Sequence, residues 1–492
     1  MLYVALFPRN LLADEREIRY GLGQSNNTCL SRRDFLKAAS VSLVLSPEMV
    51  HRVAGAVPRG VVLIKNGQLI DGTGRGPSQN TSILIENGRF KEISGANLRA
   101  PAGARVIDAT GRTILPGLID MHAHLISGGF DTVKERSMTY DPVEQKKVLK
   151  QMLYWGVTAV CDPVQPLGSG LELRALASRN AFPSPRLFIS GPAFTAPGGW
   201  GGANQPAARI ELQDLREVKP QVSRVARARV DILKLFYDDM SSSFTRPLPK
   251  LEKRLMEAVI KEAHARKLKV MVHAYRTEDH KDAMRAGADI MAHSAITSAV
   301  DDEYIELARL NHTLYLATLS VYHDVFDERV IREFIAQEFV KKTVPKKTLA
   351  TLTAREPLDS FEKSIKQDFI KKQLSTIEAN LKKLSEIGIP IGVGPDTGVP
   401  GSFPGISVHR EMELMVQSGV TPARVLVAAT KTAAEYLGQK SLGTVETGKI
   451  ADLLVVRGNP LENIQNTREI EVVVKEGQVI NREKLLSEIM SS

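Results

Sequence analysis

Two hydrophobic patterns divide this chain. Near both ends, short runs rich in Val, Ile and Leu stop at Asn-Gly or Glu-Gly turns, as in Val61–Gly67, Ser82–Gly88 and Glu471–Gly477. Such runs are typical of β-strands joined by tight turns. We therefore predict that residues 57–114 and 439–492 together build one small composite β-sandwich domain.

Between these segments, short apolar runs alternate with longer amphipathic stretches, which is the pattern of repeated βα units. Eight such runs are the number that closes a barrel. The predicted strands are Leu118–His124, Val157–Asp162, Arg186–Gly191, Asp231–Tyr237, Lys269–Tyr275, Asp289–Ser294, Thr313–Thr318 and Pro390–Asp396. The predicted fold class is thus α/β, a (β/α)8 TIM-type barrel over residues 115–438 with the small β-sandwich beside it. Residues 323–385 exceed a normal connection and are predicted to form a helical insertion that can cover the pocket.

Residues 1–56 have the pattern of an export signal. Ser31-Arg32-Arg33-Asp34-Phe35-Leu36-Lys37 precedes a small and apolar run and then Ala54-Gly55-Ala56. This order is typical of a twin-arginine (Tat) signal peptide, which predicts export by the Tat machinery to the periplasm or outside a bacterial cell. The alternative is that the arginine pair simply opens a helix. No run approaches the about 18 apolar residues that a membrane span needs.

Composition narrows the classes of protein. A length of 492 residues suits two structural units, and 43% hydrophobic with 25% charged residues is ordinary for a soluble globular protein. The net charge of +9 comes from scattered Lys and Arg, so no nucleic-acid partner is expected. Of the two cysteines, Cys29 lies in the predicted signal, which leaves Cys161 without a partner for a disulfide. Association with further copies of the chain stays open.

The predicted strands end in polar residues of one kind. Barrel enzymes place their functional groups at these C-terminal ends. The residues are His122, His124, Lys234, His273, His293 and Asp396. Residues i and i+2 of a strand share a face, so the first two histidines can share one metal. Each histidine alone could be a core residue, but their convergence favours a metal site, and imidazole with carboxylate suits zinc.

Lys234 needs a separate explanation, because an ammonium group in a buried strand would repel a metal. Burial lowers the pKa of a lysine, and the neutral amine can take up carbon dioxide to form a carbamate. A carbamate on Lys234 could bridge two divalent metal ions, most simply Zn²⁺. The alternative is an unmodified structural lysine.

Several segments resemble one known family. Leu115-Pro116-Gly117-Leu118-Ile119-Asp120-Met121-His122-Ala123-His124 resembles the opening motif of the amidohydrolase superfamily, and Gly448-Lys449-Ile450-Ala451-Asp452-Leu453 resembles its closing motif. Thr421-Pro422-Ala423, Ala429-Thr430 and Asn459-Pro460-Leu461 look like the branch of imidazolonepropionase-related and Xaa-Pro dipeptidase (prolidase-like) enzymes. The resemblance implies that His122, His124 and Asp396 bind one metal, that carbamylated Lys234 bridges, and that His273 and His293 bind the second.

The implied activity is hydrolysis of an amide bond in a small molecule of dipeptide or N-acyl amino acid type. A metal-bridging hydroxide would attack the carbonyl, while Asp396 accepts the proton and delivers it to the leaving amine. Tyr237, Trp200 and His323 are candidate substrate contacts, although packing explains the first two equally well. Trp200 stands where many relatives have a histidine after two glycines, which argues against a standard dipeptide site.

Two other functions stay open. A mononuclear metal-dependent deaminase or cyclic-amide hydrolase would use the same histidines and Asp396 without Lys234, but a deaminase needs a Glu soon after His273, and Glu278 comes late. A non-catalytic barrel scaffold is the third alternative, and the retained ligand-type residues argue against it. The remaining histidines are expected to be structural or on the surface, namely His264, His280, His312 and His409.

Overall fold

The computed structural model describes residues 60–95, 98–125, 141–200, 206–243, 245–325, 328–353, 366–399 and 401–491. The predicted export signal, with Arg32 and Arg33, lies outside these ranges. None of the helices within them is long and apolar enough to cross a lipid bilayer.

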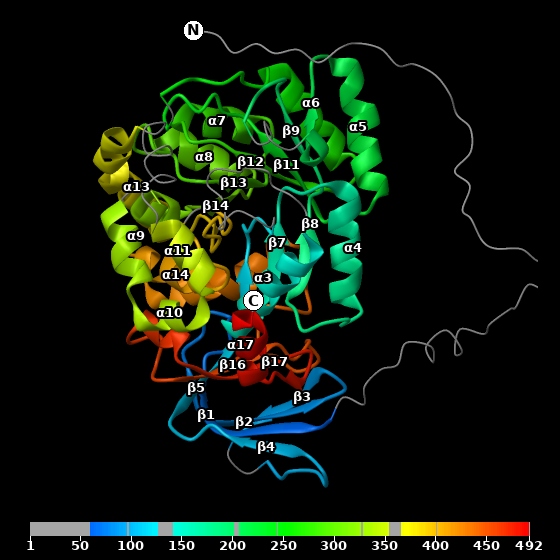
Figure 1. The fold of residues 1–492 in the computed structure, drawn as a ribbon, viewed down its shortest axis with the longest axis vertical. Coiled ribbons are helices and arrows are strands. Elements are labelled where there is room, and N and C mark those ends of the chain that lie inside the picture. The colour runs from blue at the N-terminus through cyan, green and yellow to red at the C-terminus, as the bar shows by residue number, and fades with distance from the viewer. Residues whose placement is uncertain are drawn as a thin grey trace, which may run out of the picture. The chain divides into compact units, whose positions relative to one another are not determined.

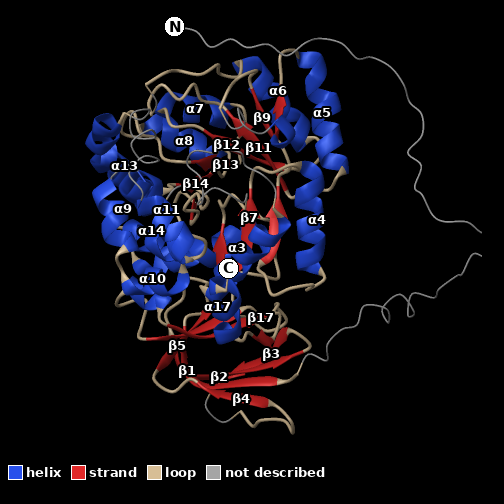
Figure 2. Cartoon of the chain, viewed as in Figure 1, coloured by secondary structure: helices blue, strands red, loops and turns tan. Residues whose placement is uncertain are grey.

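Parallel strands lie among helices in the part of the molecule above the terminal sheet (Figures 1 and 2). They are β6 (Leu118–Asp120), β7 (Val157–Asp162), β8 (Arg186–Ile189), β11 (Ile232–Phe236), β12 (Lys269–His273), β13 (Ile290–Ala292), β14 (Leu314–Leu316) and β15 (Ile391–Gly392). Strands β6 to β8 pair in one sheet, and β11 to β15 pair in order in another. The N–H of Asp231 donates to the carbonyl of Ile189, and that of Met121 to the carbonyl of Val393, so both gaps between the sheets are bridged. The ring of eight strands confirms the predicted α/β barrel.

Helices cover the outside of this barrel, because most of them follow a strand and pack an apolar face against the sheet. They are α3 (Pro142–Tyr154), α4 (Leu167–Ser178), α5 (Leu215–Arg227), α6 (Lys253–His264), α7 (Thr277–Arg285), α8 (Asp302–Leu310), α14 (Ile406–Gln417) and α15 (Pro422–Val427). Two short strands, β9 (Ala193–Thr195) and β10 (Arg209–Glu211), extend the sheet beside β11. The short helices η1 (Pro206–Ala208) and η3 (Ala428–Thr432) complete the connections.

Alternate residues of the strands fill the barrel interior, as the pleat requires. Ile119, Cys161, Ile232 and Met271 belong to one buried apolar cluster. Helix α16 (Ala433–Tyr436) contributes Ala433 and Ala434 to the same cluster. The interior is therefore a packed core, and the predicted ligand residues lie toward the C-terminal end of the barrel.

A helical segment separates β14 from β15, where the sequence predicts an insertion. It consists of the π-helix η2 (Val321–Val325), α9 (Glu328–Ile335), α10 (Glu338–Thr343), α11 (Lys346–Thr353) and α13 (Gln367–Glu386). Ile331, Phe334 and Val340 of this segment pack with Trp155 and Phe403 in a cluster of their own. The segment is thus anchored on the flank of the barrel. Its role as a lid stays a prediction.

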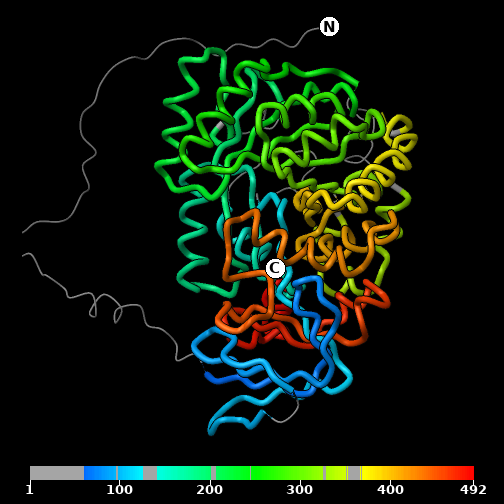
Figure 3. The backbone as a smooth tube through the Cα atoms, turned by 180° about the vertical axis from the view of Figure 1, so that it is seen from behind, coloured from blue at the N-terminus to red at the C-terminus, as the bar shows by residue number. Residues whose placement is uncertain are grey.

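Strands from both chain ends form one sheet, which Figure 3 shows as blue and red segments lying together. The strands are β1 (Val62–Leu69), β2 (Ser78–Glu86), β3 (Arg89–Ser94), β4 (Arg105–Asp108), β5 (Arg112–Pro116), β16 (Leu453–Arg457), β17 (Ile470–Lys475) and β18 (Gln478–Val479). The first half of β1 pairs with β4 and its second half with β5, so the sheet bends over itself. Ile64, Ile85 and Val455 pack together inside this bend. The short helix η4 (Ile464–Arg468) and α17 (Arg482–Met490) complete the C-terminal segment. The exact domain boundaries remain predictions.

A group of ion pairs joins the terminal sheet to the lower end of the barrel, which is the end where the strands begin. The Arg186 guanidinium at the start of β8 donates to Asp452 at 3.0 Å and to Glu476 at 2.7 Å. Asp452 also accepts the backbone N–H of Glu476. Lys475 donates to the same Oε1 of Glu476 that accepts from Arg186, and Asn180 donates to Oε2. Every charged group at this junction therefore has a partner.

Candidate active site

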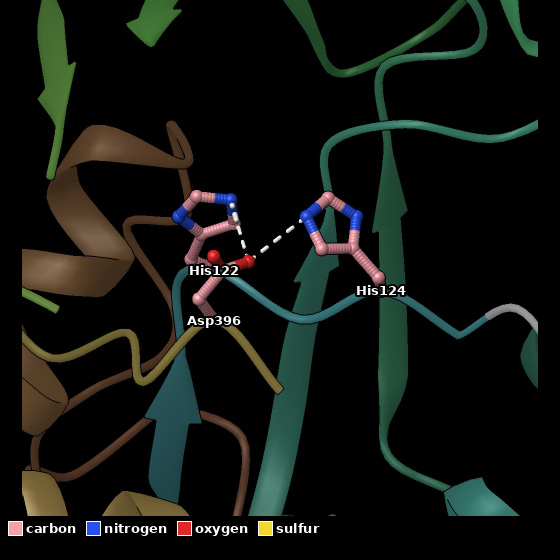
Figure 4. Close-up of side chains that lie close together, drawn as sticks. All are labelled: His122, His124 and Asp396. Atoms are coloured by element: carbon pink, nitrogen blue, oxygen red, sulfur yellow. Dashed lines mark ion pairs between the residues drawn. The ribbon is translucent and has the colours of Figure 1, made fainter. Parts of the chain in front are cut away.

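Three predicted residues meet at the C-terminal end of the barrel (Figure 4). His122 and His124 follow β6, and Asp396 follows β15. The Oδ1 atom of Asp396 lies 2.9 Å from Nε2 of His124 and 3.4 Å from Nε2 of His122. Their ligand atoms all lie within 4.8 Å of one another, a grouping that can hold a metal ion.

The backbone holds these side chains in place. The carboxylate of Asp120 accepts the N–H of His122 at 2.9 Å and the hydroxyl of Thr397 at 3.3 Å. The N–H of His124 donates to the carbonyl of Thr397. Asp396 itself has a φ of +56°, in the left-handed region that residues other than glycine seldom adopt. The connections between β6 and β15 therefore maintain an unfavourable backbone that aims Asp396 at the histidines.

A second group lies beside the first. The rings of His273 and His293 have centroids 4.4 Å apart, and the His293 ring lies 5.1 Å from that of His122. The Nζ atom of Lys234 lies 3.5 Å from Nε2 of His122 and 3.6 Å from Sδ of Met271. All six predicted ligand residues thus lie at one end of the barrel, and Lys234 lies within reach of the first group.

Burial controls the charges of this site. It lowers the pKa of His122, His273 and His293 well below the ordinary value, so these imidazoles are neutral. Burial also lowers the pKa of Lys234 to about 8, against the opposing effect of Asp396. Burial raises the pKa of Asp396, but the contact with His124 and the nearby His293 and Lys234 outweigh it, and the net shift is downward. The site therefore offers neutral imidazoles and an ionised carboxylate.

These residues fit a divalent metal. The Nε2 atom of His273 is buried and has no hydrogen-bond partner among the described residues. No carboxylate in the described ranges forms an ion pair with Lys234, although its exposed fraction is 1%. Neutral imidazoles with a carboxylate form the donor set of zinc and related ions, and a metal would satisfy the unpaired nitrogen.

The described contacts of Tyr237 are with residues outside the metal-binding group. Its hydroxyl donates to Asp282 on α7 at 3.3 Å, and Lys250 lies over its ring at 4.0 Å. Tyr237 is three residues after Lys234, so the two side chains leave the strand on opposite faces. A contact of Tyr237 with a substrate stays a prediction.

Trp200 and His323 differ in how close they come to the metal-binding residues. The Trp200 ring lies 6.5 Å from the His273 ring and packs against the cluster that contains Phe236. The Nε2 atom of His323 lies 3.1 Å from the Glu378 carboxylate on α13, inside the helical insertion. Trp200 therefore borders the site, whereas the described contacts of His323 are with the insertion. The substrate contacts of both stay predictions.

Tyr275 is a site residue that the sequence analysis missed. Its ring lies 4.9 Å from that of His273 and 5.0 Å from that of His293. Burial raises its pKa well above the ordinary value, so the hydroxyl stays protonated and can donate a hydrogen bond. The signal was present in His273-Ala274-Tyr275, which repeats the i, i+2 spacing of His122-Ala123-His124.

The remaining histidines separate into two kinds. His280 and His409 are buried, and each has both ring nitrogens within 2.9 Å of an oxygen. His264 forms an exposed pair with Asp289. These contacts are structural, in agreement with the sequence analysis.

The fold and the site define a metal-dependent barrel hydrolase, and comparison with known proteins identifies the family. The profile of the amidohydrolase family matches residues 113–480, so the chain belongs to that family. It is a hydrolase of carbon–nitrogen bonds, as the sequence predicts.

Individual relatives narrow the branch. An imidazolonepropionase of Geobacillus kaustophilus (strain HTA426) is 26% identical over 455 residues, covering 82% of this chain and 90% of that protein. A dihydroorotase of Geobacter sulfurreducens (strain ATCC 51573 / DSM 12127 / PCA) is 50% identical, but over 70 residues, which are 14% of this chain and only 16% of that protein. The crystal structure of a Xaa-Pro dipeptidase with bound methionine in its active site has a TM-score of 0.68 at 24% identity, and it covers 86% of this chain and 100% of that one. The chain thus resembles the two enzymes that the sequence analysis named.

Proposed function

We propose that this protein hydrolyses an amide bond of a small molecule of N-acyl amino acid or dipeptide type at a site with two metal ions. The observation that carries the proposal is the position of Lys234. Its buried Nζ lies 3.5 Å from His122, next to one group of ligands. His273 and His293 form a second group, and no carboxylate of the described residues forms an ion pair with either of them. A carbamate on Lys234 would supply the missing anionic bridge, and we propose Zn²⁺ as the ion.

The metal ions, when bound, polarise the carbonyl and activate water at neutral pH. Asp396 holds the proton released by the water, because its carboxylate lies at the centre of the site and remains ionised beside His124. It then gives this proton to the leaving nitrogen, which departs as a neutral amine. We propose that the Tyr275 hydroxyl, whose ring lies beside those of His273 and His293, donates to the carbonyl oxygen as negative charge develops there.

Metal analysis tests the number of ions. The purified protein should carry close to two divalent ions per chain, because six ligand-type side chains exceed what one tetrahedral zinc uses. A single ion at saturating zinc would contradict the site with two metals. Mass measurement of the intact folded protein would detect carbon dioxide added to Lys234.

A substrate panel tests the reaction. N-acyl amino acids and dipeptides should release free amino acid, whereas aminated purines, pyrimidines and triazines should release little ammonia. If Trp200 walls the pocket, bulky or aromatic substrates react fastest, and Trp200→His shifts the preference toward small dipeptides. Ammonia from a ring amine with no cleavage of any acyl amino acid would contradict the proposal.

Hydrolysis of a cyclic amide is the second candidate. It is favoured by the match to an imidazolonepropionase, which covers 82% of this chain. Lactams and cyclic imides therefore belong in the same panel. A deaminase is less well supported, because the Glu278 side chain is exposed on α7 and pairs with Lys281.

We also propose that the protein is exported by the twin-arginine route. The motivation is the order of Arg32-Arg33, the apolar run and Ala54-Gly55-Ala56. Replacing both arginines by lysine should retain the protein in the cytoplasm, as fractionation would show. Unchanged appearance of this variant outside the inner membrane would rule out the route.

A further inference from the structure

A buried carboxylate outside the metal-binding group connects two members of that group. Glu411 lies in α14 with an exposed fraction of 0%. Its Oε1 accepts the N–H of Leu319 and its Oε2 accepts the N–H of Ser320, both at 2.8 Å. In the described part of the chain, no cationic side chain forms an ion pair with Glu411. The contacts of this carboxylate are therefore concentrated on the loop after β14.

That loop contacts both halves of the metal-binding group. The hydroxyl oxygen of Thr318 lies 3.0 Å from Nδ1 of His293. The hydroxyl of Ser320 donates at 3.0 Å to the carbonyl of Pro395, the residue before Asp396. The loop thus reaches one ligand of each predicted metal.

The backbone at these contacts is unfavourable. Thr318 has a φ of +49°, His293 of +78° and Asp396 of +56°. A β-branched residue such as Thr318 is especially disfavoured in this region. Such conformations persist only where the surroundings hold them, and the two N–H groups that Glu411 binds follow Thr318 directly.

We infer that Glu411 is a positioning residue for the metal site, which fixes the loop of residues 318–320 so that Thr318 orients His293 and Ser320 orients Asp396. The inference rests on the proposed metal site. A histidine that binds metal through Nε2 keeps its proton on Nδ1, and for His293 this proton faces the Thr318 hydroxyl. Glu411 itself contacts neither metal nor substrate, and it acts through the loop.

Zinc affinity of the full folded protein, measured by competition with a chelator, tests the inference without relying on turnover. Glu411→Gln keeps the volume but replaces one accepting oxygen with an NH₂ group, so one of the two loop N–H groups loses its acceptor. Zinc affinity should fall by about 10–100-fold, which is the usual loss when a partner that orients a metal ligand is removed. Thr318→Val should produce a similar loss. The double variant should lose less than the product of the two single losses, because both act through one contact.

Glu413→Gln is the matched control. Glu413 lies on the same helix but pairs with Arg410 and Arg468, away from the loop. It should leave zinc affinity unchanged even if the melting temperature falls.

The outcomes separate this inference from the proposed function. If the wild-type protein binds no zinc, both the proposed site and the inference fail. If the wild type binds zinc and Glu411→Gln binds it equally well, only the positioning role fails. Should Glu411→Gln not fold, then Thr318→Val and Ser320→Ala decide, and unchanged zinc affinity in both would overturn the inference.

Discussion

Polar groups are paired at the lower end of the barrel, where the strands begin, but in the described part of the chain several lack partners at the upper end, where the strands end. At the lower end, Arg186, Asp452 and Glu476 satisfy one another at distances of 2.7–3.0 Å. At the upper end, Lys234 is buried without a carboxylate ion-pair partner among the described residues, and Nε2 of His273 has no hydrogen bond there. A buried polar group without a partner destabilises the folded state, so it is not explained by a contribution to stability. The lower end thus stabilises the fold, whereas the upper end is arranged to bind a ligand.

Replacing the upper carboxylate should have the largest effect. Asp396→Asn keeps the shape but removes the proton acceptor, so kcat should fall by about 10²–10⁴. Steady-state kinetics on the best substrate of the panel would measure this. The matched control is Asp452→Asn at the lower end, which should lower the melting temperature and spare kcat. A loss below tenfold in Asp396→Asn would assign the proton transfer to another group.

Lys234→Ala should follow, with kcat/KM lower by about 10²–10³, since metal-centred charge stabilisation is worth several kcal/mol. Bound metal should fall toward one ion per chain. Short carboxylic acids should restore part of the activity by occupying the position of the carbamate. Lys475→Ala is the control, because Lys475 is also buried but pairs with Glu476. Full activity in Lys234→Ala would make both lysines structural and remove the contrast between the two ends.

The lower end should respond in stability. Arg186→Ala leaves Asp452 and Glu476 without their shared guanidinium, and hydrogen bonds of charged groups contribute about 1.5–3 kcal/mol. Arg186 retains some solvent contact, so we expect a decrease in the free energy of unfolding at the low end of that range. Denaturant unfolding and kinetics on the same preparation would show whether the loss is confined to stability. A large decrease in kcat in a fully folded Arg186→Ala variant would contradict the conclusion that the lower end serves stability and the upper end serves catalysis.

A histidine whose partners are complete gives a smaller, pH-dependent test. Burial lowers the pKa of His409 from 6.5 to about 3, so the folded protein keeps this imidazole neutral. Between these values the unfolded chain binds more protons, and stability therefore decreases as the pH falls below about 6.5. Going from pH 7 to pH 5 should cost roughly 1–2 kcal/mol through this residue. In His409→Gln the pH dependence of unfolding should become shallower by that amount, and an unchanged slope would show that His409 is protonated in the fold.

The sequence predicts the barrel correctly, and it predicts six candidate ligands that the structure brings to one end of the barrel, because both predictions depend on local periodicity. Strand alternation placed His122 and His124 on one face, and the ends of predicted strands gave His273 and His293. The same rule also points to Tyr275, which lies two residues after His273 and shares its face of the strand. Glu411 was beyond such rules. Its partners are two backbone N–H groups, 91 and 92 positions away in the sequence. They belong to an irregular turn, which no periodicity predicts.

The pairing of β5 with β16 has a consequence for synthesis. Leu115 lies opposite Leu454, and the side chain of Arg112 bonds Glu471 across 359 positions. While the chain is still on the ribosome, β5 presents an unpaired edge until its neighbour β16 has been translated, several hundred residues later. Contacts of such long separation also form slowly. A nascent chain that stops before β16 therefore keeps an open sheet edge that proteases and chaperones can recognise, and pairing with β16 covers that edge.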